Sequence, residues 1–174
     1  QFITGTVSIA TDDMGVNVVP VHFTYVTATT AKGSANATFT TLKNIIDGVI
    51  GTIMKDGKEK AGKLRIDSAL GLNEFYSDRN GTEELVSAKR NEGGFITVVS
   101  SINEDETKRN TFDVDMVITG TRMIEADEEK DLPEKLIVKG CIFDFRKAML
   151  PIEFSVLNPN AISYFEGLGA SQVE

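Results

Sequence analysis

The sequence has little of the side-chain chemistry on which most enzymes and metalloproteins depend. Its 174 residues include one cysteine, one histidine and no tryptophan. The single cysteine, Cys141, cannot form an internal disulfide, which argues against a disulfide-stapled secreted scaffold and favours a reducing compartment. One Cys and one His cannot supply a zinc or iron cage. No apolar run approaches the roughly 20 residues that span a bilayer, so we expect no membrane partner.

The residues that remain do not form a catalytic motif. His22 lies between the apolar residues Val21 and Phe23, a pattern that favours a structural histidine over a member of a catalytic triad. Cys141 has apolar neighbours and is expected to be a small core residue. The glycines do not form a phosphate-binding or dinucleotide-binding fingerprint. We therefore expect a protein that is not an enzyme, with no cofactor and no metal.

Acidic residues outnumber basic ones, but unevenly. The net charge is −8, yet residues 55–109 hold ten of the 18 Lys and Arg side chains. Residues 125–134 form an acidic run without the spacing of a calcium-binding loop, and we interpret it as a solvated loop. The hypothesis of a cation-dependent hydrolase is supported only by such scattered carboxylates. Because salt screens charge beyond roughly 8–10 Å, a local basic face could still bind a polyanion.

The order of apolar residues predicts short strands and two helices. Alternating β-branched and aromatic residues predict strands over 2–10, 16–28, 63–76, 84–90, 95–102, 111–124, 136–145 and 150–157. Residues 78–81 predict a hairpin turn, and Gly93-Gly94 predicts a second turn. An apolar stripe at helical spacing predicts an amphipathic helix over 39–54, capped by Thr38 or Thr40. Asn158 and Pro159 predict the start of a short helix over 159–168.

These elements favour a mainly β fold of the α+β class. About eight short strands and one medium helix indicate a Greek-key barrel or sandwich. The length predicts a single β-rich domain over residues 1–174. Because the chain begins with Gln1 and ends without a stop signal, we expect a fragment of a longer protein that lacks a C-terminal continuation.

Basic and aromatic residues alternate through the middle of the chain. Single-stranded nucleic acid is bound by cations near the phosphates and by flat side chains on which bases stack. The candidate binding residues are Lys63, Arg65, Phe75, Tyr76, Arg79, Lys89, Arg90 and Phe95. The span 55–95 holds eight acidic and eight basic side chains. The alternative therefore stays open that the aromatics are core residues and that the chain is a structural or protein-interaction module, such as a virion or assembly component.

Several segments together resemble one family of proteins. The segments are residues 89–95 (KRNEGGF), 111–116 (TFDVDM), 140–146 (GCIFDFR), 150–154 (LPIEF) and 161–166 (AISYFE). They resemble a family of single-stranded DNA-binding, replication-accessory proteins encoded by phages and mobile elements of Gram-positive bacteria, and the likeness spans most of residues 1–168.

The resemblance implies an OB-like barrel, with Lys89, Arg90 and Phe95 near the DNA. It also implies a role in phage DNA replication or recombination, in the cytoplasm of a bacterial host cell. Replication or recombination proteins would be further partners. Many such binders carry an acidic C-terminal tail that recruits partners, and this sequence ends at Glu174 without one. The sequence leaves the oligomeric state open.

Overall fold

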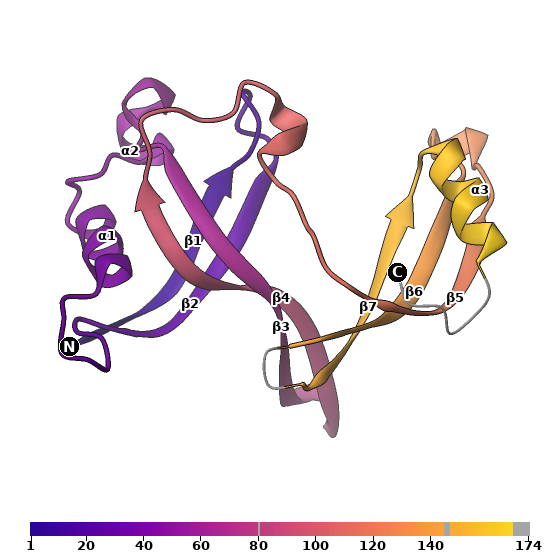
Figure 1. Cartoon of the computed structure of the whole chain (residues 1–174), viewed down its shortest axis with the longest axis horizontal. Coiled ribbons are helices and arrows are strands. Elements are labelled where there is room, and N and C mark those ends of the chain that lie inside the picture. Colours follow the sequence, from indigo (N-terminus) through magenta and orange to yellow (C-terminus); the bar gives the residue numbers. More distant parts are fainter. Residues whose placement is uncertain (80, 145–146, 169–174) are drawn as a thin grey trace. The chain divides into compact units, whose positions relative to one another are not determined.

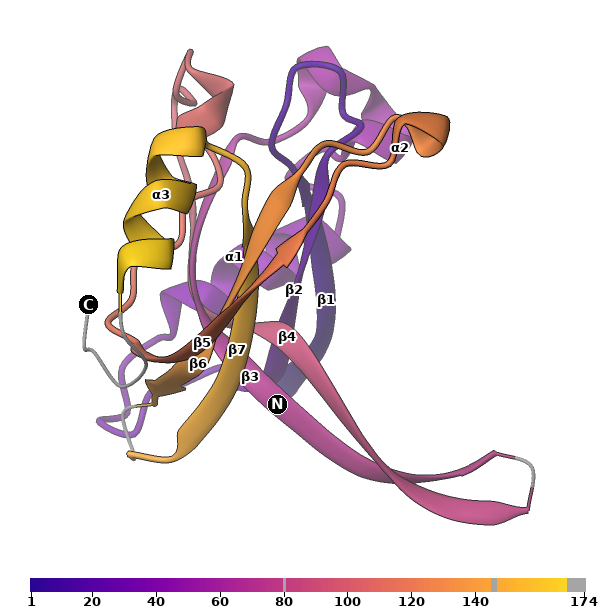
Figure 2. The same cartoon turned by 90° about the vertical axis from the view of Figure 1, so that its right-hand side faces the viewer.

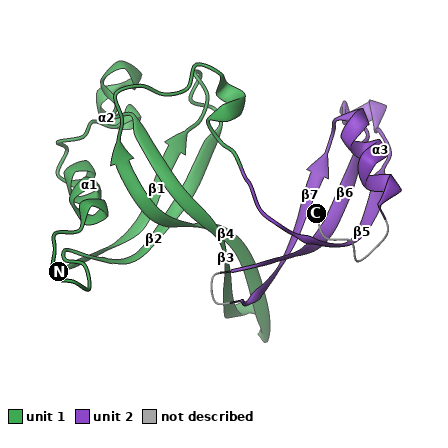
Figure 3. Cartoon of the chain, in the orientation of Figure 1, with its two compact units in different colours: residues 1–111 green, residues 112–174 purple. Residues whose placement is uncertain are grey.

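The computed structural model describes residues 1–79, 81–144 and 147–168 (Figure 1). Where the sequence predicts one domain, the contacts divide the chain into two compact units, residues 1–111 and residues 112–174 (Figure 3). Unit 1 is built on a four-stranded sheet and unit 2 on a three-stranded sheet. The mainly β, α+β class is confirmed. The described residues form seven strands in two open sheets, and they do not form the closed eight-stranded barrel expected from the sequence.

The sheet of unit 1 has the strand order β1-β2-β4-β3. Its strands are β1 (Phe2–Ala10), β2 (Val18–Thr27), β3 (Leu64–Arg79) and β4 (Thr82–Val98). Two antiparallel hairpins, β1–β2 and β3–β4, are joined by a short parallel contact that pairs Val21 with Asn91 and His22 with Glu92. The predicted turn between β3 and β4 is confirmed, because Arg79 pairs with Thr82 and Gly81 has a positive φ of 76°.

The core of unit 1 lies on one face of this sheet, under helix α1 (Ala37–Ile46). Val21, Phe23 and Ile96 are buried there with Leu42 of this helix. Partly buried apolar side chains surround them: Ile3, Val7, Val19, Val26, Ile45, Leu64 and Ile66. We call this the inner face, and the opposite side of the sheet the outer face. The inward positions are those that the alternation along each strand predicts.

Helix α1 is shorter than the sequence predicts. It begins after Asn36, whose side chain accepts a hydrogen bond from the Thr38 backbone N–H, and it ends at Ile46 rather than at residue 54. Gly48 has a φ of 77°, a conformation that a helix interior does not contain. A separate turn of helix, α2 (Ile53–Asp56), follows, and Val49 in between is 74% exposed. The predicted helical stripe is therefore wrong beyond Ile46.

A β-bulge replaces the turn predicted at Gly93-Gly94. β4 runs through these glycines without a break, and the register shifts so that Ser68 pairs with Gly93 but Asp67 pairs with Phe95. Because side chains alternate between faces, one extra residue reverses the alternation. Gly93 packs against Phe23 on the inner face. After the bulge, Ile96 is fully buried and Phe95 is 70% exposed.

Unit 2 has its own sheet and core. Strands β5 (Val117–Ile124), β6 (Lys135–Phe143) and β7 (Met149–Val156) pair in that order, all antiparallel. Helix α3 (Pro159–Gly167) starts at the predicted cap, because the Asn158 side chain accepts hydrogen bonds from the N–H groups of the first turn. Its core includes Met116, Ile118, Leu136, Val138, Ile142, Ile152, Val156 and Ile162. The predicted strand start at Thr111 is wrong, because β5 begins at Val117.

The connection between the predicted strands over 136–145 and 150–157 falls partly outside the described residues. Among the described residues, every helix is too short or too polar to cross a bilayer.

The packing of Gly93 on Phe23 gives a stability prediction. A Cβ at residue 93 would lie 2.5 Å from the Phe23 ring, so Gly93→Ala must displace a fully buried side chain. We expect a loss of about 1–3 kcal/mol in the free energy of unfolding, typical of overpacking. Gly120→Ala in β5 is the control, because a Cβ there meets nothing within 4 Å. Urea unfolding measures both, and equal stability of the two variants would contradict the packing argument.

Candidate nucleic-acid interface

The outer face of unit 1 carries the basic and aromatic residues nearest to one another. Residues paired across antiparallel strands share a face. Because Ile66 and Ile96 pair on the inner face, the neighbouring pairs place Arg65, Thr97, Asp67 and Phe95 on the outer face. All four are exposed. Lys63, also exposed, lies two residues before Arg65 and therefore extends the same side.

Phe95 is the most exposed aromatic residue of this face, at 70%. The bulge at Gly93-Gly94 turns its ring outward, and the pairing partner is Asp67 rather than another apolar residue. A second aromatic surface lies at the other end of the sheet, where the rings of Phe2 and Tyr25 stack with centroids 4.5 Å apart. Tyr25 has a φ of 52° at a register shift between β1 and β2. Flat side chains are thus available at two places on one sheet.

The cations of the outer face are accompanied by carboxylates. An Arg65 guanidinium nitrogen lies 3.1 Å from an Asp67 carboxylate oxygen, and both side chains are more than half exposed. Arg90 forms a second ion pair with Glu92, and both are about one-third exposed. Exposed pairs of this kind contribute little and exchange readily with another anion. The outer face therefore has three cations, Lys63, Arg65 and Arg90, and the two carboxylates of Asp67 and Glu92. Its net charge is about +1, although the net charge of the whole chain is −8.

A shallow depression lies where β4 diverges from β2. It has a volume of about 250 Å³ and is lined by Thr6, Pro20, His22, Lys89, Arg90 and Asn91. The Asn91 side-chain amide donates to the Pro20 carbonyl at 3.1 Å and fixes β4 beside β2. His22 is half-buried, and its Nδ1 lies 3.2 Å from the Thr6 hydroxyl. Two cations and hydrogen-bonding groups around one hollow suit an anion such as a phosphate.

Sequence reasoning missed Thr6 and the position of His22. The histidine is hydrogen-bonded, as a structural residue is, but it lies on the outer face beside the basic residues. The signal was present, because Val21 and Phe23 on either side are buried and alternation directs His22 the other way.

The structure does not bring all eight predicted residues together. Phe75 and Tyr76 lie on the distal part of the β3–β4 hairpin, far along the strands from Arg65. They are 45% and 68% exposed, so they are not the core residues that the alternative interpretation required. Adjacent residues on a strand point to opposite faces, so the two rings do not form one platform. The Arg79 side chain lies outside the described residues. Lys63, Arg65, Arg90 and Phe95 share the outer face, with Lys89 at its margin.

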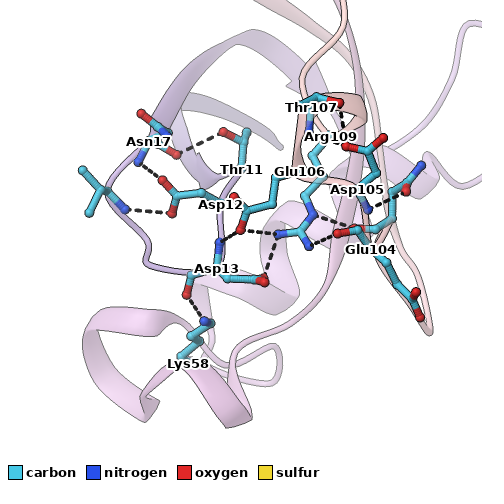
Figure 4. Close-up of polar contacts among 12 residues, drawn as sticks. Thr11, Asp12, Asp13, Asn17, Lys58, Glu104, Asp105, Glu106, Thr107 and Arg109 are labelled. Carbon is cyan, nitrogen blue, oxygen red and sulfur yellow. Dashed lines mark hydrogen bonds and ion pairs between the residues drawn. The ribbon is translucent and has the colours of Figure 1, made fainter.

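The acidic residues near the start of the chain belong to a loop network rather than to a cation site (Figure 4). The Arg109 side chain, only 9% exposed, donates to Asp13 at 2.8 Å and to the backbone carbonyls of Asn103 and Glu104 at 2.6 and 3.2 Å. The Asp13 backbone N–H donates to the Glu106 carboxylate at 2.5 Å. Arg109 therefore ties the β1–β2 loop to the segment that follows β4.

The other members of this network are also engaged. Asp12 accepts hydrogen bonds from the backbone N–H groups of Val16 and Asn17, at 2.9 and 2.6 Å, and so closes the β1–β2 loop. Lys58 donates to the Asp13 backbone carbonyl. In the acidic run of unit 2, Asp127 pairs with Lys130 at 2.7 Å. The described part of the chain holds no group of three or more Cys, His, Asp or Glu arranged to bind a metal ion.

The network lowers the pKa of three carboxyl groups. The hydrogen bond from Arg109 is the main cause that holds the pKa of Asp13 below its ordinary value of 3.8. The Asn17 N–H does the same for the pKa of Asp12, and Thr107 for the pKa of Asp105. A carboxyl group whose pKa is lower in the folded state stabilises that state above its unfolded pKa. The stabilisation is lost as the pH falls through the folded pKa.

This sign gives a pH prediction for Arg109→Met. The wild type loses stability on acidification below about pH 4, where these carboxylates take up protons. We expect the variant to melt a few degrees lower at pH 7 and to show a smaller further loss between pH 4 and pH 2. Lys43→Met is the control, because it removes an exposed ion pair between Lys43 of α1 and Asp47, the residue that follows the helix. Thermal melting followed by circular dichroism measures this, and parallel pH curves for wild type and Arg109→Met would contradict it.

Comparison with known proteins identifies a family but no characterised relative. No curated protein and no solved structure matches the chain. The family model described as YorF matches residues 1–171, which is almost the whole sequence and includes both units. The chain therefore belongs to the YorF family.

Proposed function

We propose that unit 1 binds single-stranded DNA on its outer face, without catalysing a reaction. The observation that carries this proposal is Phe95, a phenylalanine 70% exposed on an open sheet. Arg65 lies on the same face of the neighbouring strand, two residues before Asp67, the pairing partner of Phe95. An exposed ring offers a face to a base of any sequence, and base–aromatic stacking contributes roughly 1–3 kcal/mol per base.

The basic residues supply the second requirement. Arg65 lies on β3, at one edge of the sheet, and Lys63 lies just before that strand. Arg90 lies on β4, toward the centre of the sheet, and lines the depression with His22 and Lys89. A strand that stacks a base on Phe95 would place its phosphates within reach of these cations on either side. Phosphates would then displace the exposed carboxylates from their arginine partners. The proposed binding is therefore electrostatic along the backbone and independent of sequence.

The biological setting is part of the same proposal. The resemblance to phage and mobile-element proteins supports a role in DNA replication or recombination in the cytoplasm of a bacterial host. Replication or recombination proteins would then be further partners.

A second candidate is a protein-interaction or structural module that does not bind nucleic acid. The observation that favours it is the distal β3–β4 hairpin, where exposed Tyr76 and Leu85 lie among acidic residues. Acidic, apolar surfaces repel nucleic acid and suit protein contacts. The two candidate functions use different surfaces of unit 1, the outer face for DNA binding and the distal hairpin for protein contacts. Substitutions on the outer face therefore distinguish between them.

Phe95→Ala tests the stacking platform. We expect the affinity for a fluorescein-labelled oligo-dT to fall about five- to 150-fold, because one stacked base is lost. Phe112→Ala, which removes a ring 58% exposed in unit 2, is the control and should bind as the wild type does. Fluorescence anisotropy at low salt measures the Kd. If Phe95→Ala binds with the same Kd as the wild type, the proposed site is wrong. It is also wrong if the wild type does not bind at low salt.

Lys63→Ala combined with Arg65→Ala tests the electrostatic part. The logarithm of the binding constant for single strands falls with the logarithm of salt concentration, with a slope of about −0.7 for each phosphate neutralised. We expect the double variant to reduce the magnitude of the slope by about 1.4. Titrations at four salt concentrations give the slopes. Wild-type binding that is indifferent to salt would contradict a phosphate-binding face.

A further inference from the structure

Strand β1 is an unprotected edge of the unit 1 sheet. It is the first strand in the order β1-β2-β4-β3, and among the described strands it pairs only with β2 (Figure 2). Residues 1–10 contain no charged residue and no proline. The bulge in this hairpin puts its extra residue on β2, so β1 itself stays regular. A long edge strand without lysine, proline or a bulge of its own is a template for pairing with another chain.

Every second residue of β1 directs its backbone hydrogen-bonding groups away from β2. At the turn end of the hairpin, the Thr11 N–H donates to the Asn17 carbonyl at 2.9 Å. Because residues that bond to the partner strand alternate with residues that do not, the odd-numbered residues of β1 bond to β2. The even-numbered residues direct their N–H and C=O groups to the free edge, and they include Thr4, Thr6 and Ser8. Among the described residues, these backbone groups have no hydrogen-bonding partner.

An apolar groove lies along this edge on the inner face. It has a volume of about 180 Å³, and it is lined by residues 3–7 of β1, Phe23 of β2 and three residues of α1, Leu42, Ile45 and Ile46. Consecutive strand residues alternate between faces, so a lining of five in a row means that the groove reaches the backbone edge of β1. Helix α1 packs mainly against β4 and forms the opposite wall, where Ile46 is 63% exposed.

Gly5 leaves an empty position in the middle of the groove. Its neighbours on the same face, Ile3 and Val7, pack against the core, whereas a Cβ at Gly5 would meet nothing within 4 Å. A side chain opposite Gly5 on an added strand would fill this space. The groove suits one ring or one branched aliphatic side chain, since cavities of about 150 Å³ accommodate benzene.

We propose that β1 and this groove bind an extended, uncharged segment of a partner protein, which adds a fifth strand to the sheet. The backbone of the segment would bond to Thr4, Thr6 and Ser8, and its alternate side chains would enter the groove. This division of labour between main-chain bonds and side-chain pockets is general for strand addition. The segment has apolar residues at alternate positions, with a large one opposite Gly5 and small polar residues opposite the threonines.

The chemistry of the groove separates this occupant from two others. Its lining residues carry no charge, so nucleic acid meets no cation there and a charged side chain would lose hydration without compensation. A second copy of β1 would present Ile3 and Val7, which are already packed against the core of that copy. The occupant is therefore a segment whose apolar side chains are not already buried in a folded domain. The proposal is independent of DNA binding, because Phe95 lies on the opposite face.

Fluorescence anisotropy of the full chain with a labelled peptide tests the proposal. The probe is a fluorescein-labelled peptide of sequence EGTVTFTVTGK, in which a phenylalanine stands between two valines at alternate positions. We expect saturable binding to the wild type. Alanine in place of this phenylalanine should raise the Kd at least about tenfold, because the space at Gly5 is then left empty.

Two N-methylated versions of the peptide test the main-chain pairing. One is methylated on the amides of the threonines that flank the phenylalanine, and the other on the amides of the phenylalanine and of the valine that follows it in the pattern. Only alternate amides of an added strand face β1. One version should therefore bind at least about tenfold more weakly, and the other should bind as the unmodified peptide does. Equal Kd values for the two versions overturn the proposal.

Ile46→Lys tests the groove. Ile46 is exposed at the end of α1, where a cation suits the helix dipole, so we expect an unchanged melting temperature and a peptide Kd raised at least about tenfold. Val49→Lys is the control, because it adds the same charge at an exposed residue that does not line the groove. Phe95→Ala, which affects only the proposed DNA site, should bind the peptide as the wild type does.

Three further results overturn the proposal. The first is a wild type that binds no version of the peptide at concentrations up to about 1 mM. The second is peptide binding that Ile46→Lys leaves unchanged. The third is a dimer of the chain alone, seen by sedimentation equilibrium, that Ile46→Lys dissociates, because the groove then belongs to a second copy.

Discussion

The contact of Gly93 with the ring of Phe23 is the constraint on which unit 1 depends. In the described strands, the β2–β4 ladder that joins the β1–β2 hairpin to the β3–β4 hairpin consists of two residue pairs, and this contact lies beside them. A side chain at residue 93 would force β4 away from β2. The adjacent bulge follows from the same packing, because the chain must regain its inward alternation at Ile96. Phe95 is outward for that reason alone. The distal part of the β3–β4 hairpin, residues 70–79 and 82–90, extends from the point where β4 leaves β2 (Figure 2).

Local patterns in the sequence predict much of the fold. Alternation predicts β1 and β2, the turn residues predict the hairpin at Arg79 and Thr82, and Asn158 with Pro159 predicts the start of α3. These elements are specified by neighbouring residues. The predictions that are wrong depend on distant contacts. Gly93-Gly94 has the composition of a turn, and only the ring of Phe23, 70 residues earlier, makes it a bulge. The helix predicted over 39–54 stops because Gly48 takes a positive φ.

The sequence predicts only part of the candidate site, because the rest also depends on contacts between distant residues. Closeness in sequence grouped Phe75 and Tyr76 with Lys63 and Arg65, but a strand of 16 residues separates its two ends in space. The face that each residue occupies depends on the bulge, which composition does not reveal. The apolar neighbours of His22 predict a structural histidine, although alternation between them places its side chain on the outer face.

Unit 1 carries a basic, aromatic outer face and an acidic, apolar distal hairpin, and we propose that nucleic acid contacts only the outer face. The most direct measurement is photo-crosslinking of the full chain to a 5-iodouracil-substituted oligo-dT, with the attached residue identified by peptide mass spectrometry. Excited iodouracil attacks a stacked aromatic side chain, so we expect attachment at Phe95. Attachment at Phe75 or Tyr76, or only in residues 112–168, would contradict it.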